Sequence, residues 1–460
     1  MASKSKRARM APQRNFLKTF MYWAIAVFLI KLIIIINIPV GNIDVGNGKL
    51  FFVDKIWLGA DGENYLKGYN SLQVEGVFSK ADILNYWPAG YPLVILFLSL
   101  FGKSWALTSL AVLQSLLFSF GAYFFASQLY RTRLKRFSYL VFILIILNPT
   151  LSLSSLAIGY ESFTASGFLI AIGLIIKDLV EKNDKGFIKY LVINSLIFGL
   201  LTFMQPRLII SGILVVLLWI IIRKGLKLGS IFLIASLAIT LFFPATLIYR
   251  NDKAINQKSI SANLGVTMNI GAGDKATGGY MKKDFGVPCE TSGNPSQQDN
   301  QRVKCVINWY ENNPSKAIKL FYNKTLFFWS PWYGPEANGT MARNPWLKIS
   351  PLKNIASTNE GSNLIYGGFG QIISWLWLFG GIALLVYGFV VLWRVGSLEK
   401  FIALAALAIV GTNWLISLIS IGDHRFRIPI MGMSLFLQAI GLKTLFNRGK
   451  VLMVDGPALR

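Results

Sequence analysis

Two carboxylates lie two residues apart in the segment GADGENY, residues 59–65, shortly after the first long apolar run of the chain. A well-placed carboxylate can act as a general base and remove the proton from an acceptor hydroxyl. Asp is also a favoured helix N-cap, and an acidic side chain in a first helical turn is stabilised by the helix dipole. On local grounds, Asp61 and Glu63 therefore fit a helix start at least as well as they fit catalysis.

Further polar residues occur where other apolar runs end. Glu161 lies in GYESF and Arg207 lies in MQPRL. The segment GDHRFRIP contains His424, Arg425 and Arg427, and its histidine is the only one in the chain. Glu161 could simply begin a helix, and the arginines could simply reach toward the membrane surface. A charge at a membrane boundary is nevertheless costly unless it is paired or used.

Carboxylates and arginines on one face of a membrane suit one kind of chemistry. An arginine binds a phosphate group with two parallel hydrogen bonds. A carboxylate accepts the proton of an attacking hydroxyl. A phosphate already leaves as an anion and needs no acid. One carboxylate and a cationic phosphate site would therefore be sufficient to transfer a sugar from a lipid phosphate.

The composition identifies the environment in which these residues work. The chain has 460 residues, of which 54% are hydrophobic and 15% are charged, with a net charge of +25. Soluble proteins carry about 25% charged residues, and a span needs about 20 apolar ones. Many basic residues flank the apolar runs, as the positive-inside rule requires. We therefore predict an all-α polytopic membrane protein and no nucleic-acid partner.

The apolar runs and their basic flanks predict ten spans. Their approximate bounds are 18–39, 105–129, 137–157, 162–180, two spans sharing 187–222 around MQPR, 229–249, 367–393, 401–420 and 428–445. The basic N-terminal tail, 1–17, is predicted to be cytoplasmic. An even number of spans places the C-terminal tail, 446–460, on the same side. The transmembrane module 18–249 then carries a long outer loop, 40–104, which holds the acidic pair. A second outer loop, 250–366, precedes the last three spans, 367–445.

Both outer loops contain apolar stretches that are too short or too polar to span. GYPLVILFLSLFG, residues 90–102, and KAIKLFYNKTLFFWSPWY, residues 316–333, are predicted to lie along the membrane interface. The two cysteines, Cys289 and Cys305, both fall in the second loop. A disulfide between them is expected if this loop faces an oxidising compartment.

Several segments, taken in order, resemble motifs of the multi-spanning GT-C glycosyltransferases that use polyprenyl-phosphate sugars, in particular the protein O-mannosyltransferase and aminoarabinose-transferase branch. They are LGADGENYLKGYNSL, WPAGYPLVILFLSLFG, GYESF, LLTFMQPRLII, SANLGVTMNIGAGDKATGGY, NNPSKAIKLFYNKTLFFWSP and GDHRFRIPIMGMSLFLQAIGL. Two departures stand out. Pro206 precedes Arg207, and Gly62 separates two acidic residues that are adjacent in many relatives.

The resemblance implies a GT-C-like fold and an inverting glycosyltransferase of the inner or plasma membrane with its active site on the outer face. Asp61 would be the base, and Glu161 would position a substrate or help to hold a divalent cation such as Mg or Mn. The polyprenyl phosphate would be bound by Arg207, Arg425 and Arg427. Substrate-binding roles would fall to Glu63, Tyr65, Tyr91, Asn263, Asn269 and His424. The acceptor would be a lipid, a glycan or a protein.

Two other functions fit the same topology. A polysaccharide polymerase or ligase would use a diphosphate-linked donor. A transporter or flippase for lipid-linked sugars usually places ionisable groups near the middle of the membrane. The predicted spans are nearly free of charge there, and Lys31 is the main exception.

Overall fold

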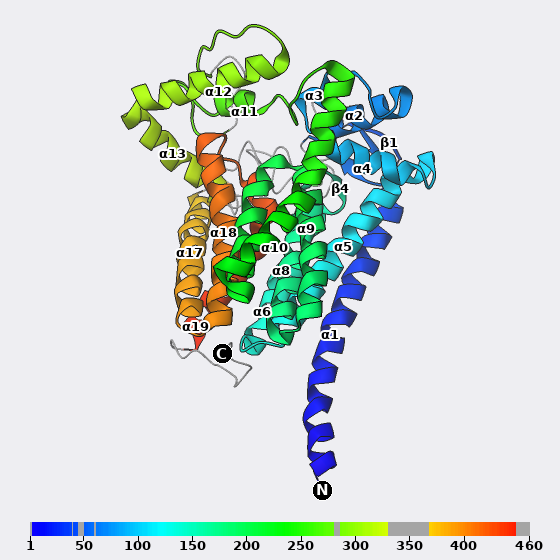
Figure 1. The fold of residues 1–460 in the computed structure, drawn as a ribbon, viewed down its shortest axis with the longest axis vertical. Helices are drawn as coiled ribbons and strands as arrows, with labels where there is room; N and C mark the ends of the chain where they lie inside the picture. The colour runs from blue at the N-terminus through cyan, green and yellow to red at the C-terminus, as the bar shows by residue number, and fades with distance from the viewer. Residues whose placement is uncertain are drawn as a thin grey trace.

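A computed structural model describes residues 2–38, 40–44, 50–58, 61–279, 286–329 and 368–447. Within these ranges the chain is a helical bundle, and eight helical segments are long and apolar enough to cross a membrane (Figure 1). They are Leu17–Asn37, Lys103–Leu129, Glu161–Glu181, Asp184–Met204, Pro206–Gly225, Gly229–Ile255, Ser397–Ile419 and Arg425–Phe446. The chain is a multi-pass membrane protein.

These segments belong to a few long elements. The helices are α1 (Ala2–Asn37), α5 (Ala106–Leu129), α8 (Glu161–Glu181), α9 (Asp184–Met204), α10 (Ile209–Ile255), α18 (Ser397–Ile419) and α19 (Met431–Phe446), with short 3-10 turns η1 (Lys103–Trp105), η2 (Pro206–Leu208) and η4 (His424–Ile430). Side chains such as Ile36 on α1 and Phe242 on α10 are more than 60% exposed. Exposed apolar faces of this kind suit contact with lipid.

The two other predicted spans, 137–157 and 367–393, contain no helix among the described residues that is as long and apolar as these eight segments. Residues 137–157 form α6 (Lys135–Ile146) and α7 (Pro149–Ser154), which are separated at Asn148 and Pro149. Asn148 caps α7 through its side chain, and a proline suits the first turn of a helix. The other, α17 (Gly368–Trp393), has a shorter apolar stretch, Leu378–Trp393.

The chain reverses direction at Pro206, within the MQPR segment around which two spans are predicted, and at Gly225. Pro206 opens η2 between α9 and α10. Gly225 interrupts α10 with a φ of +71°, which favours glycine over residues with a side chain. The two segments here, Asp184–Met204 and Pro206–Gly225, have 21 and 20 residues and extend beyond the predicted range 187–222, because the helices continue into their polar flanks.

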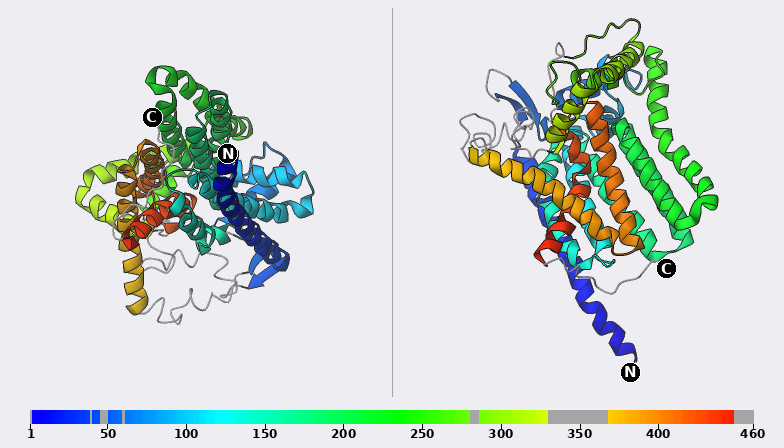
Figure 2. Two further views of the ribbon diagram at one scale, coloured as in Figure 1. Left: turned by 90° about the horizontal axis from the view of Figure 1, so that it is seen from below. Right: turned by 90° about the vertical axis from the view of Figure 1, so that its left-hand side faces the viewer.

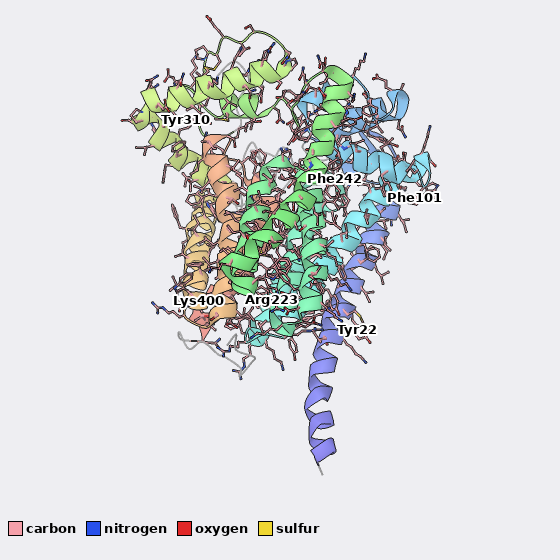
Figure 3. The ribbon with its side chains drawn as sticks, in the orientation of Figure 1. Tyr22, Phe101, Arg223, Phe242, Tyr310 and Lys400 are labelled. Carbon is pink, nitrogen blue, oxygen red and sulfur yellow. A yellow bond between two sulfur atoms is a disulfide. The ribbon has the colours of Figure 1, made fainter. Side chains whose placement is uncertain are left out.

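Both loops predicted to be outer loops lie at one end of the bundle. The first contains β1 (Val40–Asp44), β2 (Leu50–Asp54), β3 (Trp57–Leu58), α2 (Gly62–Glu75), α3 (Ile83–Tyr86) and α4 (Gly90–Ser99); the second contains α11 (Leu264–Ile270), α12 (Pro295–Asn312) and α13 (Pro314–Trp329). Figures 1 and 2 place them opposite the start of α1. Figure 3 shows Arg223 and Lys400 at the end opposite Tyr310 of α12.

The second loop builds a small core of its own, although its many polar residues suggest otherwise. Met268, Ala272, Val287 and Val306 are buried together. A disulfide joins Cys289 to Cys305 beside them. We call this part, formed by α11, residues 286–294 and α12, the outer unit.

Candidate active site

A two-residue parallel pairing joins the segments that carry the two catalytic candidates. Trp57 and Leu58 of β3 pair with Ala157 and Ile158 of β4 (Ala157–Ile158). Beyond the pairing, the first segment continues to Asp61 and the second to Glu161. Gly62 packs so closely that a Cβ there would lie 3.3 Å from the carbonyl oxygen of Ile158. The pairing therefore brings together two acidic residues that are far apart in the sequence.

Arg425 lies between these two carboxylates. Its Nη2 is 2.6 Å from Oδ2 of Asp61, and its Nε is 3.5 Å from Oε1 of Glu161. The side chains of Asp61, Glu161 and Arg425 are only 18%, 13% and 13% exposed. We call these three residues the acid–arginine cluster. In such a shielded place, a charge-assisted contact is stronger than on an open surface.

Asp61 occupies the N-cap position of α2, yet its side chain makes no capping hydrogen bond. The carboxylate is directed to Arg425 instead. Helix capping, the more ordinary explanation of this residue, therefore does not account for the orientation of its side chain.

The turn that carries Arg425 is fixed by its own neighbours. Asp423 accepts a hydrogen bond from the backbone N–H of Arg425 at 2.9 Å. The N–H of Gly422 donates to the carbonyl of Gly278 at 2.9 Å, and a Cβ at Gly422 would lie 2.5 Å from the backbone of Lys324. Close backbone crossings of this kind require glycine.

A second arginine stands beside the cluster. Nη2 of Arg207 donates to the hydroxyl of Tyr160 at 3.1 Å, and its guanidinium carbon lies 4.1 Å from the centre of the Phe426 ring. The guanidinium of Arg425 lies 5.3 Å from the same ring. Nε of Arg207 has no hydrogen-bond partner among the described residues, whereas Nε of Arg425 faces Glu161 at 3.5 Å. The two guanidinium groups therefore place two positive charges side by side, where an anionic ligand could bind.

Tyr65 adds a neutral hydroxyl next to the cluster. It is buried, and its ring centre lies 6.4 Å from that of Tyr160. Burial raises the pKa of Tyr65 well above its usual value, and the nearby Tyr160, Asp61 and Glu161 raise it further. Tyr65 therefore stays protonated and could donate a hydrogen bond to a ligand.

The structure gives Tyr91 and Arg427 other contacts. The hydroxyl of Tyr91 donates to Gln114 and accepts the N–H of Gly159, so it is used inside the protein. Nη1 of Arg427 donates to the carbonyl of Trp329 at 2.8 Å. In a 3-10 turn with three residues per turn, residues two apart point in different directions, so Arg427 does not follow Arg425 into the cluster.

Three further candidates lie outside the cluster. Glu63 is exposed and pairs with Lys67 at 2.7 Å. Asn269 donates to the carbonyl of Val287, and Asn263 stands at the N-cap of α11. His424 begins η4 beside Arg425, and its side chain lies outside the described part of the chain.

The site also contains residues that the sequence patterns did not single out. Tyr160 precedes Glu161 and bonds Arg207, and Phe426 lies between Arg207 and Arg425. Each adjoins a charged candidate within a quoted motif. This adjacency is the signal that could have found them.

The donor set fits a guanidinium better than a divalent cation. Among the described residues, no group of three or more His, Cys, Asp or Glu side chains could hold a metal ion. The two nearby carboxylates, Asp61 and Glu161, both lie against Arg425. The position between them, where a cation would bind, is therefore filled by an arginine.

No protein-family model and no curated protein matches the chain. A search of solved structures finds a likeness to the archaeal oligosaccharyltransferase AglB from Archaeoglobus fulgidus, in complex with an inhibitory peptide and a dolichol-phosphate, with a TM-score of 0.44 and 14% sequence identity. The match covers 93% of this chain and 51% of that chain, so this chain spans about half the length of AglB.

Proposed function

We propose that the chain is a membrane glycosyltransferase that moves a sugar from a polyprenyl-phosphate donor to a hydroxyl acceptor. The observation that carries the proposal is the acid–arginine cluster, in which a shielded Asp61 lies against Arg425 with Arg207 close by. The order of the quoted motifs, which resembles that of the GT-C glycosyltransferases, supports it as well.

The reaction needs one proton acceptor and one anion site. The acceptor oxygen attacks the anomeric carbon opposite the phosphate, and a bond forms between them. The bond from the anomeric carbon to the phosphate oxygen breaks, and its electron pair stays on the phosphate. The acceptor proton passes to the carboxylate of Asp61. The sugar is therefore transferred with inversion, and polyprenyl phosphate is released.

The two arginines would hold the phosphate as a pair of neighbouring cations. Nε of Arg207 makes no hydrogen bond among the described residues. Arg425 faces Asp61 through Nη2 and Glu161 through Nε, so a phosphate that engages Nη2 competes with Asp61. Donor binding at Nη2 would therefore release the Asp61 carboxylate to meet the acceptor, while Glu161 would keep its contact with Nε.

The donor and acceptor can be found with the full-length chain reconstituted in lipid vesicles. The vesicles receive polyprenyl-phosphate and polyprenyl-diphosphate sugars together with lipid, glycan and peptide acceptors. Release of polyprenyl phosphate and labelling of one acceptor support the proposal. Release of polyprenyl diphosphate would identify a polymerase or ligase instead. Movement of a labelled lipid-linked sugar across the membrane without release would identify a flippase.

A further inference from the structure

The short segment that leads to Glu161 is bound along both of its edges. On one edge, residues 157 and 158 pair with β3, and the N–H of Trp57 donates to the carbonyl of Leu156 at 2.9 Å. On the other edge lie side chains from α5, α4 and α1. We call residues 155–159 the Glu161 lead.

Gln114 of α5 binds the second edge. It is fully buried, and its Nε2 donates to the carbonyls of Ser155 and Ala157 at 3.2 Å and 3.0 Å. Carbonyls only accept, so the amide nitrogen of Gln114 must face them. Its Oε1 then accepts a hydrogen bond from Tyr91 at 3.1 Å.

Tyr91 binds the next residue along the same edge of the lead. Its hydroxyl accepts the N–H of Gly159 at 2.9 Å. Residues 155, 157 and 159 alternate along one edge of the lead, and Gln114 and Tyr91 together bind all three. Because Gly159 lies two residues before Glu161, these bonds help to fix the position of the backbone from which the Glu161 side chain extends.

Lys31 fixes the other end of the lead. Its Nζ donates to the hydroxyl of Ser155 at 2.9 Å and lies 4.0 Å from the centre of the Phe118 ring. Lys31 lies in the membrane-spanning part of α1 and is 2% exposed. A lysine in a span is costly unless it is used or paired. The contacts with Ser155 and Phe118 hold this polar side chain in the interior of the bundle.

We propose that Gln114 is a positioning residue for the glycosyl transfer, acting with Tyr91 to hold the Glu161 lead so that Glu161 and Asp61 meet Arg425 together. The inference rests on the proposed function, because the rate it controls is that of the reaction assigned to the cluster. Arg425 touches carboxylates from two segments, and the β3–β4 pairing passes any shift of one segment to the other. A misplacement of about 1 Å can slow a reaction by about 100-fold.

The test uses two variants of the full-length protein and one control. Tyr91→Phe keeps the ring that packs 5.0 Å from Tyr65 but removes both hydrogen bonds. Gln114→Met keeps the length of the side chain and removes its donors and acceptor. Tyr69→Phe is the control, since the hydroxyl of Tyr69 bonds Gln73 on the same helix and Ser99 at the end of α4, and neither residue belongs to the Glu161 lead.

The expected result is a split between kinetic constants. Both test variants should lower kcat by about 10–100-fold while KM for the donor and the thermal unfolding midpoint stay near those of the control. Hydrogen exchange at the Gly159 amide should become faster in Tyr91→Phe and stay unchanged in Tyr69→Phe. Wild-type kcat in both test variants, or losses of kcat and stability that run in parallel, would overturn the inference.

The two proposals fail in different ways. A wild-type protein that transfers no sugar from any donor contradicts the proposed function. Unchanged exchange at Gly159 contradicts the positioning role whatever the activity, because it shows that Tyr91 and Gln114 do not hold the lead.

Discussion

Oδ2 of Asp61 lies 2.6 Å from Nη2 of Arg425, and this contact joins the proposed base to the proposed phosphate ligand. The contact holds the carboxylate in a fixed orientation. In the proposed mechanism a donor phosphate engages the same Nη2 atom and frees the carboxylate for the acceptor. The proposed order of binding is therefore donor before acceptor.

Replacing Asp61 by Asn should remove the base and preserve the fold. Asn keeps the size of the side chain and can still accept a hydrogen bond from Arg425. A general base contributes about 10²–10⁴-fold to a rate, so kcat should fall by that factor. The measurement is the release of polyprenyl phosphate in vesicles. Full activity in this variant would remove Asp61 from the mechanism.

Glu63→Gln is the matched control for Asp61→Asn. It makes the same change two residues away, on an exposed side chain that pairs with Lys67. An exposed pair of this kind contributes little to stability. We expect activity close to that of the wild type, and a large loss would show that Glu63 has a role that its position in the structure does not suggest.

Arg207→Lys should weaken donor binding more than it slows the chemical step. Lys keeps the positive charge and loses the planar fork that binds a phosphate with two hydrogen bonds. A hydrogen bond to a charged group contributes about 1.5–3 kcal/mol, which corresponds to a rise in KM for the donor of about 10–150-fold. The control is Arg302→Lys in the outer unit, whose Nη2 donates to Thr291 and Gln298. Equal donor KM values for the two variants would contradict a phosphate role for Arg207.

The sequence predicts the parts of this fold that depend on local patterns. Hydropathy finds the eight segments that are long and apolar enough to cross a membrane, and MQPR, which contains Pro206, marks the turn between α9 and α10. The bends at Asn148 and in η4 are harder to predict, because they depend on single caps and turns. The core of the outer unit consists of a few buried apolar residues, and they are hard to recognise in a segment whose composition is mostly polar.

The cluster itself could be predicted only in part. Position at span ends places Asp61, Glu161, Arg207 and Arg425 at one end of the bundle. The pairing of β3 with β4 is two residues long, too short for any periodic signal, and it decides which carboxylates meet. The direction of each side chain depends on such contacts, and the sequence does not show that Asn269 bonds the carbonyl of Val287 or that Arg427 bonds the carbonyl of Trp329.

Loss of the disulfide should destabilise the outer unit. Cys289 and Cys305 are separated by 16 residues, and closing a loop of about this length lowers the entropy of the unfolded chain by an amount that corresponds to about 3 kcal/mol. The double variant Cys289→Ala and Cys305→Ala should therefore open the unit to proteases at lower temperature. Treatment with a reducing agent should reproduce the effect in the wild type and have none in the variant. Equal protease resistance of both proteins would show that the buried core suffices.

The folded state, in which Lys324 of α13 is buried, should become more stable as the pH rises above neutrality. Lys324 is fully buried, and its Nζ donates to the hydroxyl of Tyr310 and the carbonyl of Leu418, both at 2.8 Å. Burial lowers the pKa of Lys324 to about 7, whereas an unfolded lysine titrates near about 10.4. Between these two pH values the unfolded state binds more protons than the folded state, so the free energy of unfolding rises with pH across this window. Below about pH 7 the full destabilisation caused by burying the lysine remains.

The test of this dependence compares the wild type with Lys324→Met. Burial also raises the pKa of Tyr310, so this neighbour stays neutral across the same range. The difference in unfolding midpoint between pH 7 and pH 9.5 should be larger in the wild type than in the variant. Identical pH profiles of the two proteins would show that the pKa of Lys324 does not differ between the folded and unfolded states.

Gly159→Ala should move Glu161 away from Arg425. A Cβ at position 159 would overlap Oε2 of Glu161, and the end of that side chain can turn aside at little cost to the fold. The ion pair of 3.5 Å with Arg425 would then lengthen, and kcat should fall by about 10-fold or more if Glu161 positions a substrate. The control is Gly411→Ala on α18, where a Cβ meets no described atom within 4 Å. If Gly159→Ala transfers sugar as fast as the control, the contact between Glu161 and Arg425 has no part in the reaction, and Asp61 with the two arginines must be sufficient.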